Sequence, residues 1–430
     1  MRVLLLGATG LIGSAVAARL GTAGHEVVGV ARGVDSAARR VPVARWIALD
    51  LRAIRGPEDW LPHLAGIDAV LNCAGTLQDN GRDSTARVHA EAPAALWAAC
   101  ERAGVRRVLQ MSAMGVDRPA ATEFMRTKQA GDAALAASGL DWVILRPSVV
   151  LGRQAYGGSA LIRGLAALPC AIPVKEAGAV DAVQLDDVAE TVLRMIEPGA
   201  PSRVAFDMAG PERLEFADVV ARYRAWLGWK PAWTLRVPGF AMALAWRLGD
   251  LAAWFGWRPP VRTTARIELA RGSTGDNAVW RELTGMTPTP LKTALAASPA
   301  GVQDRWFAQL FLLKPVVVIA FALFWLLTGL ITLGPGRAEA IRLTEATAAA
   351  PWAWELVVGG ALFDVLMGVL LLHRRTIRPA LIVAFIGTAG YLLAGTMLMP
   401  ELWADPLGRL LKIVPVMVLN LVCLAMLDER

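Results

Sequence analysis

The chain has 430 residues, of which 55% are apolar and 19% charged, and its net charge is +7. This length exceeds one nucleotide-binding domain, so we expect at least one further domain. The four cysteines form no C-x-x-C pair and the four histidines do not cluster along the chain, so the sequence indicates neither a metal site nor a disulfide framework.

A glycine-rich loop joins the first predicted strand to the first predicted helix. Residues 1–6 are mostly apolar and lead into Gly7, Gly10 and Gly13, after which a helical pattern begins. Such glycines permit a tight turn, close approach of the backbone to a pyrophosphate, and close packing of helix on strand. The N–H groups at the helix start then face the phosphates. The predicted dinucleotide-binding residues of this loop are Gly7, Thr9, Gly10, Leu11, Ile12 and Gly13.

Basic residues follow the second predicted strand, residues 26–32. This strand ends about 20 residues after the glycine loop, where NAD-binding proteins place an acid on the adenosine ribose. The chain has Arg32 there, with Arg39 and Arg40 close behind. An arginine at this point favours the 2′-phosphate of NADP. The alternative is that Arg32 is a solvated loop residue.

The G-x-x-G-x-x-G spacing, with Ala8 and Thr9 inside it, resembles the short-chain dehydrogenase/reductase superfamily in its extended and atypical branches. Further segments resemble its strands, turns and acidic helix start: residues 48–51, 68–75, 107–115, 141–148 and 184–190. The resemblance covers about residues 1–300. It implies an α/β fold, a doubly wound parallel Rossmann sheet, with a substrate part at about 150–300. It also implies cofactor contacts at Asp50, Leu51, Cys73, Ala74 and Gly75.

The catalytic pair of this superfamily is incomplete in the chain. The superfamily uses Tyr-x-x-x-Lys, whose spacing puts both side chains on one helix face. The matching segment, residues 123–132, keeps Lys128 but has Phe124, which carries no titratable proton. The resemblance also implies a catalytic-site serine at Ser112. Lys128 and Ser112 are therefore the predicted catalytic residues, and Lys128 is also expected to hold the cofactor.

Three interpretations of this site remain open. Lys128 acts as the general acid or base. Alternatively, hydride delivery suffices, with Ser112 polarising a carbonyl or water completing the protonation. In the third interpretation the domain binds NADPH without catalysis, like the accessory nucleotide-binding subunit of respiratory complex I, which the chain also resembles.

Four long apolar runs follow residue 305: residues 307–333, 352–372, 380–399 and 407–427. Each approaches or exceeds the roughly 20 residues that cross a bilayer. Residues 373–378 form the most basic short loop, so the positive-inside rule predicts that this loop and the N-terminal domain are cytoplasmic. We expect a multi-pass protein of a bacterial-type inner membrane, whose positive charge faces anionic lipid and not nucleic acid.

The tail, residues 301–430, resembles the DoxX-like membrane domains, which are four-helix modules linked in some cases to quinone reduction. The resemblance rests on residues 298–307 and on the Leu-Leu-Lys-Pro sequence that ends at Pro315. It implies a C-terminal four-helix transmembrane domain and a lipophilic substrate.

Two further features bear on the membrane. Asp364 lies in the middle of the second apolar run, where burying a carboxylate costs free energy. We expect Asp364 to be either a functional residue or one that holds helices together. Its candidate partners are Asn420, Lys412 and Tyr391. Residues 237–257 are long and apolar but interrupted by charges. They predict either an interfacial helix on the bilayer or a buried helix of the substrate part.

The sequence thus predicts a membrane-anchored NADP(H)-dependent oxidoreductase that acts on a lipophilic substrate, either a quinone or a hydrophobic carbonyl. The competing prediction is a non-catalytic NADPH-binding sensor or assembly subunit. Its partner would be a membrane complex or a second copy of the chain.

Overall fold

The structure is a computed structural model that describes residues 1–79, 84–119, 122–174 and 176–428. By internal contacts the chain divides into two units. The head unit comprises Met1–Asp250 and Pro259–Arg305, and the helical unit comprises Leu251–Arg258 and Trp306–Arg430.

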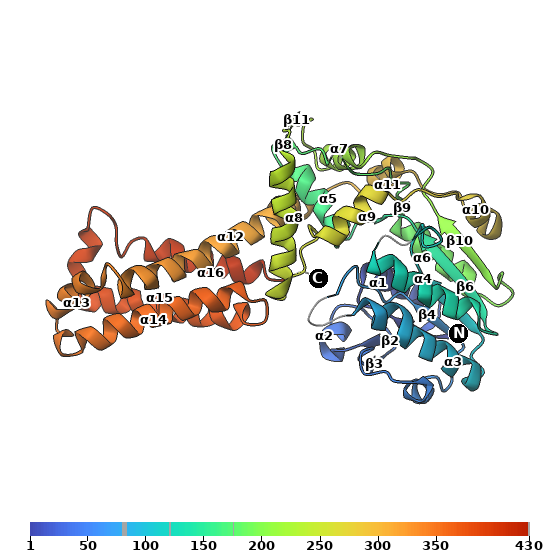
Figure 1. The fold of residues 1–430 in the computed structure, drawn as a ribbon, viewed down its shortest axis with the longest axis horizontal. Coiled ribbons are helices and arrows are strands. Elements are labelled where there is room, and N and C mark those ends of the chain that lie inside the picture. Colours follow the sequence, from blue (N-terminus) through green and yellow to red (C-terminus); the bar gives the residue numbers. More distant parts are fainter. Residues whose placement is uncertain (80–83, 120–121, 175, 429–430) are drawn as a thin grey trace. The chain divides into compact units, whose positions relative to one another are not determined.

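A parallel seven-stranded sheet forms the centre of the head unit (Figure 1), in the order β10-β6-β5-β4-β1-β2-β3. The order reverses between β1 and β4, so the carboxyl ends of these two strands flank the crevice in which doubly wound sheets bind nucleotides. This confirms the predicted Rossmann sheet. Its strands are β1 (Arg2–Leu6), β2 (Glu26–Ala31), β3 (Arg45–Ala48), β4 (Ala69–Asn72), β5 (Arg107–Met111), β6 (Asp141–Pro147) and β10 (Val204–Met208).

Helices cover both faces of the sheet. One core contains α1 (Leu11–Thr22) and α6 (Leu185–Ile196), and the other contains α3 (Ala92–Ala103) and the end of α4 (Glu123–Ala136). In β1 the side chains alternate between these cores, with Val3 and Leu5 in one and Leu4 and Leu6 in the other. Burial on both faces explains why β1 is almost continuously apolar and does not alternate with polar residues.

The remaining elements up to Ala297 are short and lie in the head unit, except that the last four residues of α8 belong to the helical unit. Two small sheets pair β7 with β9 and β8 with β11. The bounds are α2 (Val34–Ala38), β7 (Val150–Leu151), α5 (Gly158–Ala167), β8 (Cys170–Ala171), β9 (Val183–Gln184), α7 (Phe216–Trp226), β11 (Trp233–Thr234), α8 (Gly239–Trp254), α9 (Thr263–Arg271), α10 (Ala278–Thr284) and α11 (Leu291–Ala297). Short 3-10 or π turns lie at Pro57–Asp59, Leu61–His63 and Arg87–Glu91.

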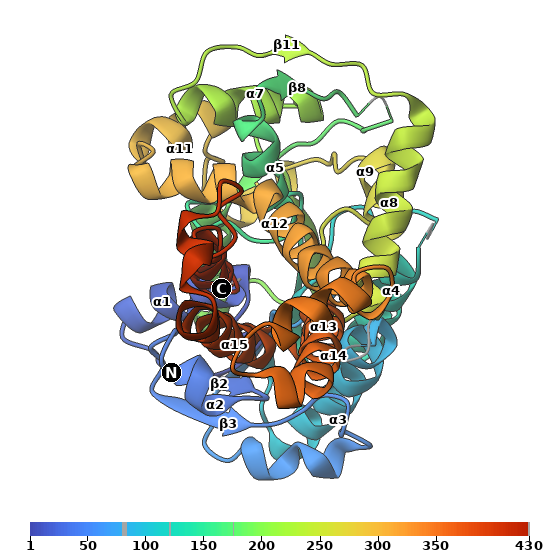
Figure 2. The same ribbon diagram turned by 90° about the vertical axis from the view of Figure 1, so that its left-hand side faces the viewer.

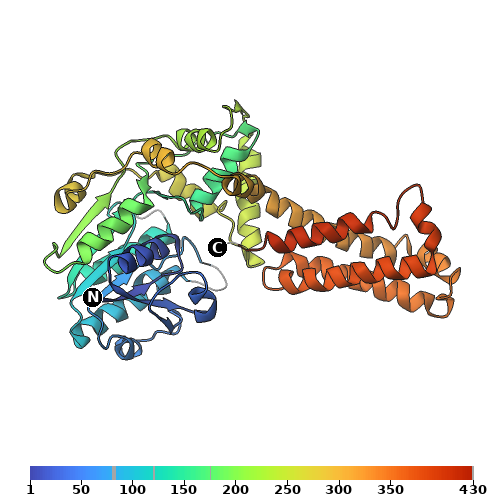
Figure 3. The same cartoon turned by 180° about the vertical axis from the view of Figure 1, so that it is seen from behind.

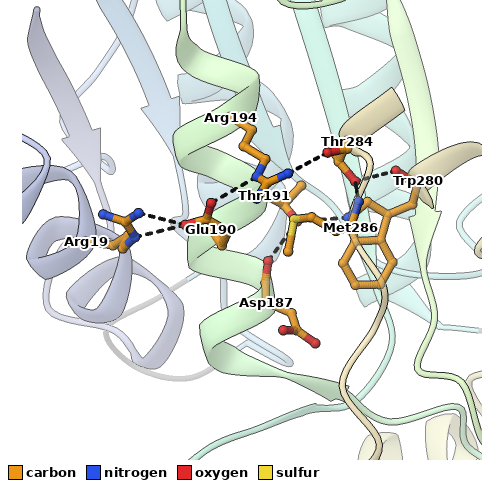
Figure 4. A network of polar contacts seen from close by, with 8 residues as sticks. All are labelled: Arg19, Asp187, Glu190, Thr191, Arg194, Trp280, Thr284 and Met286. Atoms are coloured by element: carbon orange, nitrogen blue, oxygen red, sulfur yellow. Dashed lines mark hydrogen bonds and ion pairs between the residues drawn. The ribbon is translucent and has the colours of Figure 1, made fainter. Parts of the chain in front are cut away.

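A polar network joins α6 to α1 and to α10 (Figure 4). The Arg19 guanidinium on α1 donates to Glu190, which also accepts from Arg194. On the other side of α6, the indole N–H of the fully buried Trp280 donates to Thr191 Oγ1 over 2.9 Å. This bond attaches residues near 280, far along the chain, to the Rossmann core.

A buried ion pair attaches the beginning of α12 (Val302–Leu333) to the head unit. Arg163 on α5 donates to Asp304 over 3.2 Å, and its guanidinium lies 5.1 Å from the centre of the Trp226 ring. The Trp226 indole donates to the Ser298 carbonyl. Because both charges are almost fully buried, each needs the other as a partner.

The helical unit continues α12 into α13 (Arg337–Glu345), α14 (Ala353–Leu372), α15 (Ile377–Leu398) and α16 (Ile413–Ala425). Helices α14 and α15 pack side by side, as do α15 and α16 (Figures 2 and 3). Three helical segments of the described residues are long and apolar enough to cross a membrane: Val302–Leu333, Ala350–Leu372 and Ile377–Leu398.

The prediction for residues 407–427 was wrong in length. The helix there covers only Ile413–Ala425, which is 13 residues and shorter than a hydrocarbon core requires. Pro406 lacks a backbone N–H, and Gly408 has a left-handed backbone with φ of 62°, so the helix does not extend back to residue 407. Residues 334–350, between the first two apolar runs, contain α13.

Among the three candidate partners of Asp364, the structure selects Tyr391. Its hydroxyl on α15 donates to Asp364 Oδ1 on α14 over 2.9 Å. The pair therefore links two neighbouring apolar helices. The amide of Asn420 on α16 is buried and has no protein hydrogen-bond partner among the described residues.

Replacing Thr191 with valine should destabilise the head unit. The Trp280 N–H would stay buried without an acceptor, at a cost of about 1–3 kcal/mol. Thr191→Ser is the matched control because it keeps the hydroxyl. Thermal unfolding of the purified protein in lipid nanodiscs should show a lower midpoint for Thr191→Val than for Thr191→Ser, and the reverse order would contradict the role given to this bond.

Candidate nucleotide site

The glycine loop is compact and has no space for side chains at its two ends. Gly7 has a left-handed φ of 72°, and a Cβ there would lie 2.6 Å from the Cys73 carbonyl carbon. A Cβ at Gly13 would lie 2.2 Å from the Gly7 carbonyl oxygen. The end of β1 therefore touches the end of β4, and α1 begins directly against the loop.

The start of α1 fits an anionic group. Gly10 precedes the helix, and no side chain caps the N–H groups of the first turn, which includes Leu11, Ile12 and Gly13. Uncapped N–H groups at a helix start, approached by a glycine backbone, suit the pyrophosphate of a dinucleotide. Thr9 lies in the turn just before them.

The predicted adenosine contacts lie at neighbouring strand ends. Ala31 of β2 is opposite Ala48 of β3, so Arg32 and Asp50 follow adjacent strands at the same edge of the sheet. The Arg52 guanidinium donates twice to the Asp50 carboxylate and lowers its pKa. The sequence analysis missed this arginine, which lies only two residues from Asp50. Leu51 is half-buried beside it.

Cys73, Ala74 and Gly75 follow β4 and form a turn supported by buried amides. The Asn72 side chain accepts from the Ala74 N–H and donates to Gln110 on β5. A Cβ on Gly75 would lie 3.7 Å from both His89 Nε2 and Lys128 Nζ. This contact brings the predicted cofactor turn next to the predicted catalytic lysine.

His89 is a buried neutral residue of this site that the sequence analysis did not assign. Its Nε2 accepts from the Thr76 N–H over 3.0 Å, so the ring proton is on Nδ1, which donates to Thr127. Burial, together with the Lys128 charge, lowers the pKa of His89 to about 2. No spacing in the sequence links His89 to α4, so only the fold reveals this contact.

Lys128, Ser112 and Asp132 form the polar centre of the site. Lys128 Nζ donates to the Met111 carbonyl over 2.8 Å, and the Ser112 hydroxyl donates to Asp132 Oδ2 over 2.5 Å. Burial lowers the pKa of Lys128 and raises the pKa of Asp132. Asp132 lies one helical turn after Lys128, a spacing that identifies it in the sequence but that the sequence analysis did not use.

Phe124 occupies the position of the expected tyrosine on α4. Its ring meets the His89 ring edge to face, with centroids 5.4 Å apart. Tyr223 is buried beside Arg163, and Tyr391 belongs to the helical unit. In place of a tyrosine, α4 contributes two buried ionisable side chains to the site, Lys128 and Asp132.

Lowering the pH should destabilise the wild-type protein more than a His89→Gln variant. The folded-state pKa of about 2 lies below the usual value of 6.5, so the unfolded chain takes up a proton as the pH falls from 7 to 5 and the folded chain does not. The free energy of unfolding should then fall by up to roughly 1.4 kcal/mol for each pH unit below pH 6. The midpoints of thermal unfolding, measured for both proteins between pH 5 and pH 7, test this prediction. If the midpoints of the two proteins change in parallel with pH, the prediction is wrong.

Parts of both units match families of known proteins. Residues 7–197 match the NAD(P)H-binding family, and residues 322–421 match the DoxX-like family. An uncharacterised protein of Mycobacterium tuberculosis is 27% identical over 221 residues, which are 51% of this chain and 23% of that protein. The chain thus matches less than a quarter of this relative's length. A Bacillus subtilis protein described as an uncharacterised sugar epimerase, YhfK, is 26% identical over 48% of this chain and 94% of its own.

Solved structures share the fold of the head unit. MoeE5 in complex with UDP-glucose and NAD is 21% identical, covers 73% of this chain and 100% of its own, and gives a TM-score of 0.54. The UDP-glucuronic acid 4-epimerase of Bacillus cereus with NAD is 17% identical over 72% of this chain and 100% of its own, with a TM-score of 0.53. At this level of identity the likeness shows the fold alone. The chain thus combines a Rossmann sheet, within a segment that matches an NAD(P)H-binding family, with a C-terminal segment that matches the DoxX-like family.

Proposed function

We propose that the protein is a membrane-anchored NADP(H)-dependent oxidoreductase that reduces a lipophilic substrate, either a quinone or a hydrophobic carbonyl. The observation that carries the proposal is the buried Lys128 amine beside the cofactor turn at Gly75. Burial favours the neutral amine, so the protonated amine is a stronger acid than an exposed lysine.

NADPH held at the glycine loop would supply a hydride for reduction of the carbonyl carbon. The Lys128 ammonium supplies the proton to the carbonyl oxygen, so that a ketone becomes an alcohol and the amine is recharged from solvent. Asp132 lies one turn away and offsets the lysine charge, while the Ser112 hydroxyl donates to Asp132 and holds its orientation. His89 is buried beside the amine, and the half-buried Phe124 ring packs edge to face against it.

Arg32 supports the choice of NADP, since a guanidinium at the end of β2 suits a 2′-phosphate. The DoxX-like domain supports a lipophilic substrate, because apolar helices place the chain at a membrane. The basic residues of the loop between α14 and α15 support an inner-membrane protein with its Rossmann domain in the cytoplasm.

A non-catalytic NADPH-binding sensor or assembly subunit is the second candidate. Two observations favour it. Phe124 removes the hydroxyl that the superfamily uses, and the Ser112 hydrogen is already donated to Asp132 and so is not available to a carbonyl. In this case the same site holds the cofactor, and Lys128 only contributes to binding it.

The protein should bind NADPH more tightly than NADH, and Arg32→Asp should reverse this order. Loss of a charge-assisted contact to the 2′-phosphate corresponds to about ten- to a hundredfold in affinity. Titration of cofactor fluorescence with the full-length protein in nanodiscs measures both affinities, with Arg39→Asp as a nearby charge control. Equal affinities of the parent protein for the two cofactors would refute the role of Arg32.

Lys128→Met should abolish NADPH oxidation while part of the NADPH binding persists through the glycine loop. Phe124→Tyr should keep or raise the rate, because it rebuilds the Tyr-x-x-x-Lys pair on one helix face. The assay is NADPH consumption in lipid with a panel of quinones and hydrophobic aldehydes and ketones. Gly10→Val is the binding-deficient control, because its side chain would fill the pyrophosphate position.

The assay also separates the two candidate functions. If the wild-type protein binds NADPH but consumes none above the Gly10→Val rate with any substrate of the panel, the enzymatic proposal fails for these substrates. The sensor or subunit is then favoured, and Lys128→Met changes only the retention of the cofactor.

A further inference from the structure

Helix α8 has two different faces. One carries Phe240, Leu244, Leu248 and Leu251 at helical spacing, and Phe255 follows just after the helix ends; all are exposed, with Phe240 at 77%. The opposite face carries Trp246, Gly249 and Ala253 and is buried. A Cβ on Gly249 would lie 1.6 Å from the Val261 carbonyl oxygen, so this face is in close contact and the helix cannot rotate to bury the apolar stripe.

The apolar stripe is the main concentration of exposed large apolar side chains before α12. In the rest of the described chain up to residue 301, such side chains occur singly, at Leu77, Tyr156, Ile267 and Val279. Trp233 and Leu235, which precede α8, are exposed as well, and Trp254 at its end is 86% exposed. A contiguous apolar surface of this kind marks an interaction site, whereas scattered residues do not.

The exposed charges in the sequence that contains the stripe are of one sign. The exposed charged side chains of residues 230–258 are Lys230, Arg236, Arg247 and Arg258. The one acid in this range, Asp250, accepts from Arg262 and Thr263 on the side of the head unit. An apolar stripe flanked by basic side chains complements a surface that is apolar inside and anionic at its boundary.

The end of α8 is continuous with the apolar helices of the helical unit. The Arg374 N–H donates to the Phe255 carbonyl over 2.9 Å, and the Trp257 indole donates to the Leu372 carbonyl over 2.7 Å. Leu372 is the last residue of α14, and Arg374 belongs to the basic loop that follows it. The residues after α8 therefore lie at the end of an apolar helix, where the basic loop of residues 373–378 begins, and such a junction is typical of the boundary between a bilayer and water.

We propose that α8, together with Trp233 and Leu235, lies in the interface of an anionic lipid bilayer. The stripe enters the boundary between headgroups and acyl chains, and Arg236 and Arg247 contact lipid phosphates. This membrane contact is additional to the helices of the DoxX-like domain, and it does not depend on whether the head unit is catalytic. A second copy of the chain is the competing occupant of the stripe.

The test uses the full-length protein with an environment-sensitive fluorophore on Leu244→Cys, in nanodiscs that contain spin-labelled quencher lipid. Val279→Cys is the matched control, because Val279 is an apolar residue of similar exposure on α10, 49% against 55% for Leu244. Wild-type protein treated in parallel gives the background from the native cysteines, none of which is classed as exposed. We expect blue-shifted emission and strong quenching for Leu244→Cys and little quenching for Val279→Cys.

Two outcomes overturn the proposal. Quenching at Leu244→Cys as weak as that expected at Val279→Cys would show that α8 does not enter the bilayer. Blue-shifted emission at Leu244→Cys without lipid quenching would show that protein, such as a second copy, covers the stripe.

A change of lipid composition tests whether α8 prefers anionic lipid. Quenching at Leu244→Cys should decrease when anionic lipid is replaced by zwitterionic lipid, and Arg236→Gln with Arg247→Gln should remove most of this difference. Quenching that does not depend on lipid charge would overturn the assignment to anionic lipid.

Discussion

The close approach of two backbone turns, at Gly7 and at Cys73, is the constraint on which the nucleotide site depends. With the Gly7 Cα facing the Cys73 carbonyl, no side chain fits between the ends of β1 and β4. The helix α1 can then begin directly at the switch point of the sheet, with its N–H groups open. The same segment after β4 places Gly75 beside Lys128, so one backbone contact positions both the glycine loop and the predicted catalytic lysine.

Burial determines the electrostatics around Lys128. Desolvation lowers the pKa of Lys128 and of His89 and raises that of Asp132, so each charged form is disfavoured. His89 responds by staying neutral between two hydrogen bonds, while Lys128 and Asp132 are one helical turn apart and offset each other. In place of a tyrosine hydroxyl, Phe124 adds an apolar ring that strengthens this desolvation.

The first turn of α12 belongs to the head unit and is held there by a buried ion pair. Arg163 and Asp304 pair in a nearly dry environment at the first turn of α12. Arg163 also donates to the carbonyls of Gly152 and Arg153, in the segment that leads from β7 to α5. The start of the first apolar helix is therefore bound to the segment that borders the predicted substrate part.

Spacing and hydropathy in the sequence predicted the strands, the nucleotide loop and the apolar helices, because these features depend on residues that are close together in the chain. The glycine spacing, the apolar strands and the long apolar runs predicted the Rossmann sheet, the nucleotide loop and three apolar helices, since turn geometry, strand burial and bilayer thickness each act on neighbouring residues. The prediction of the fourth run was wrong in length because hydropathy does not register a left-handed glycine. Only the tertiary structure decided that His89 contacts Thr127, that Tyr391 and not Asn420 binds Asp364, and which face of α8 remains exposed. These contacts join residues distant in sequence, and they depend on how helices pack, which no local spacing encodes.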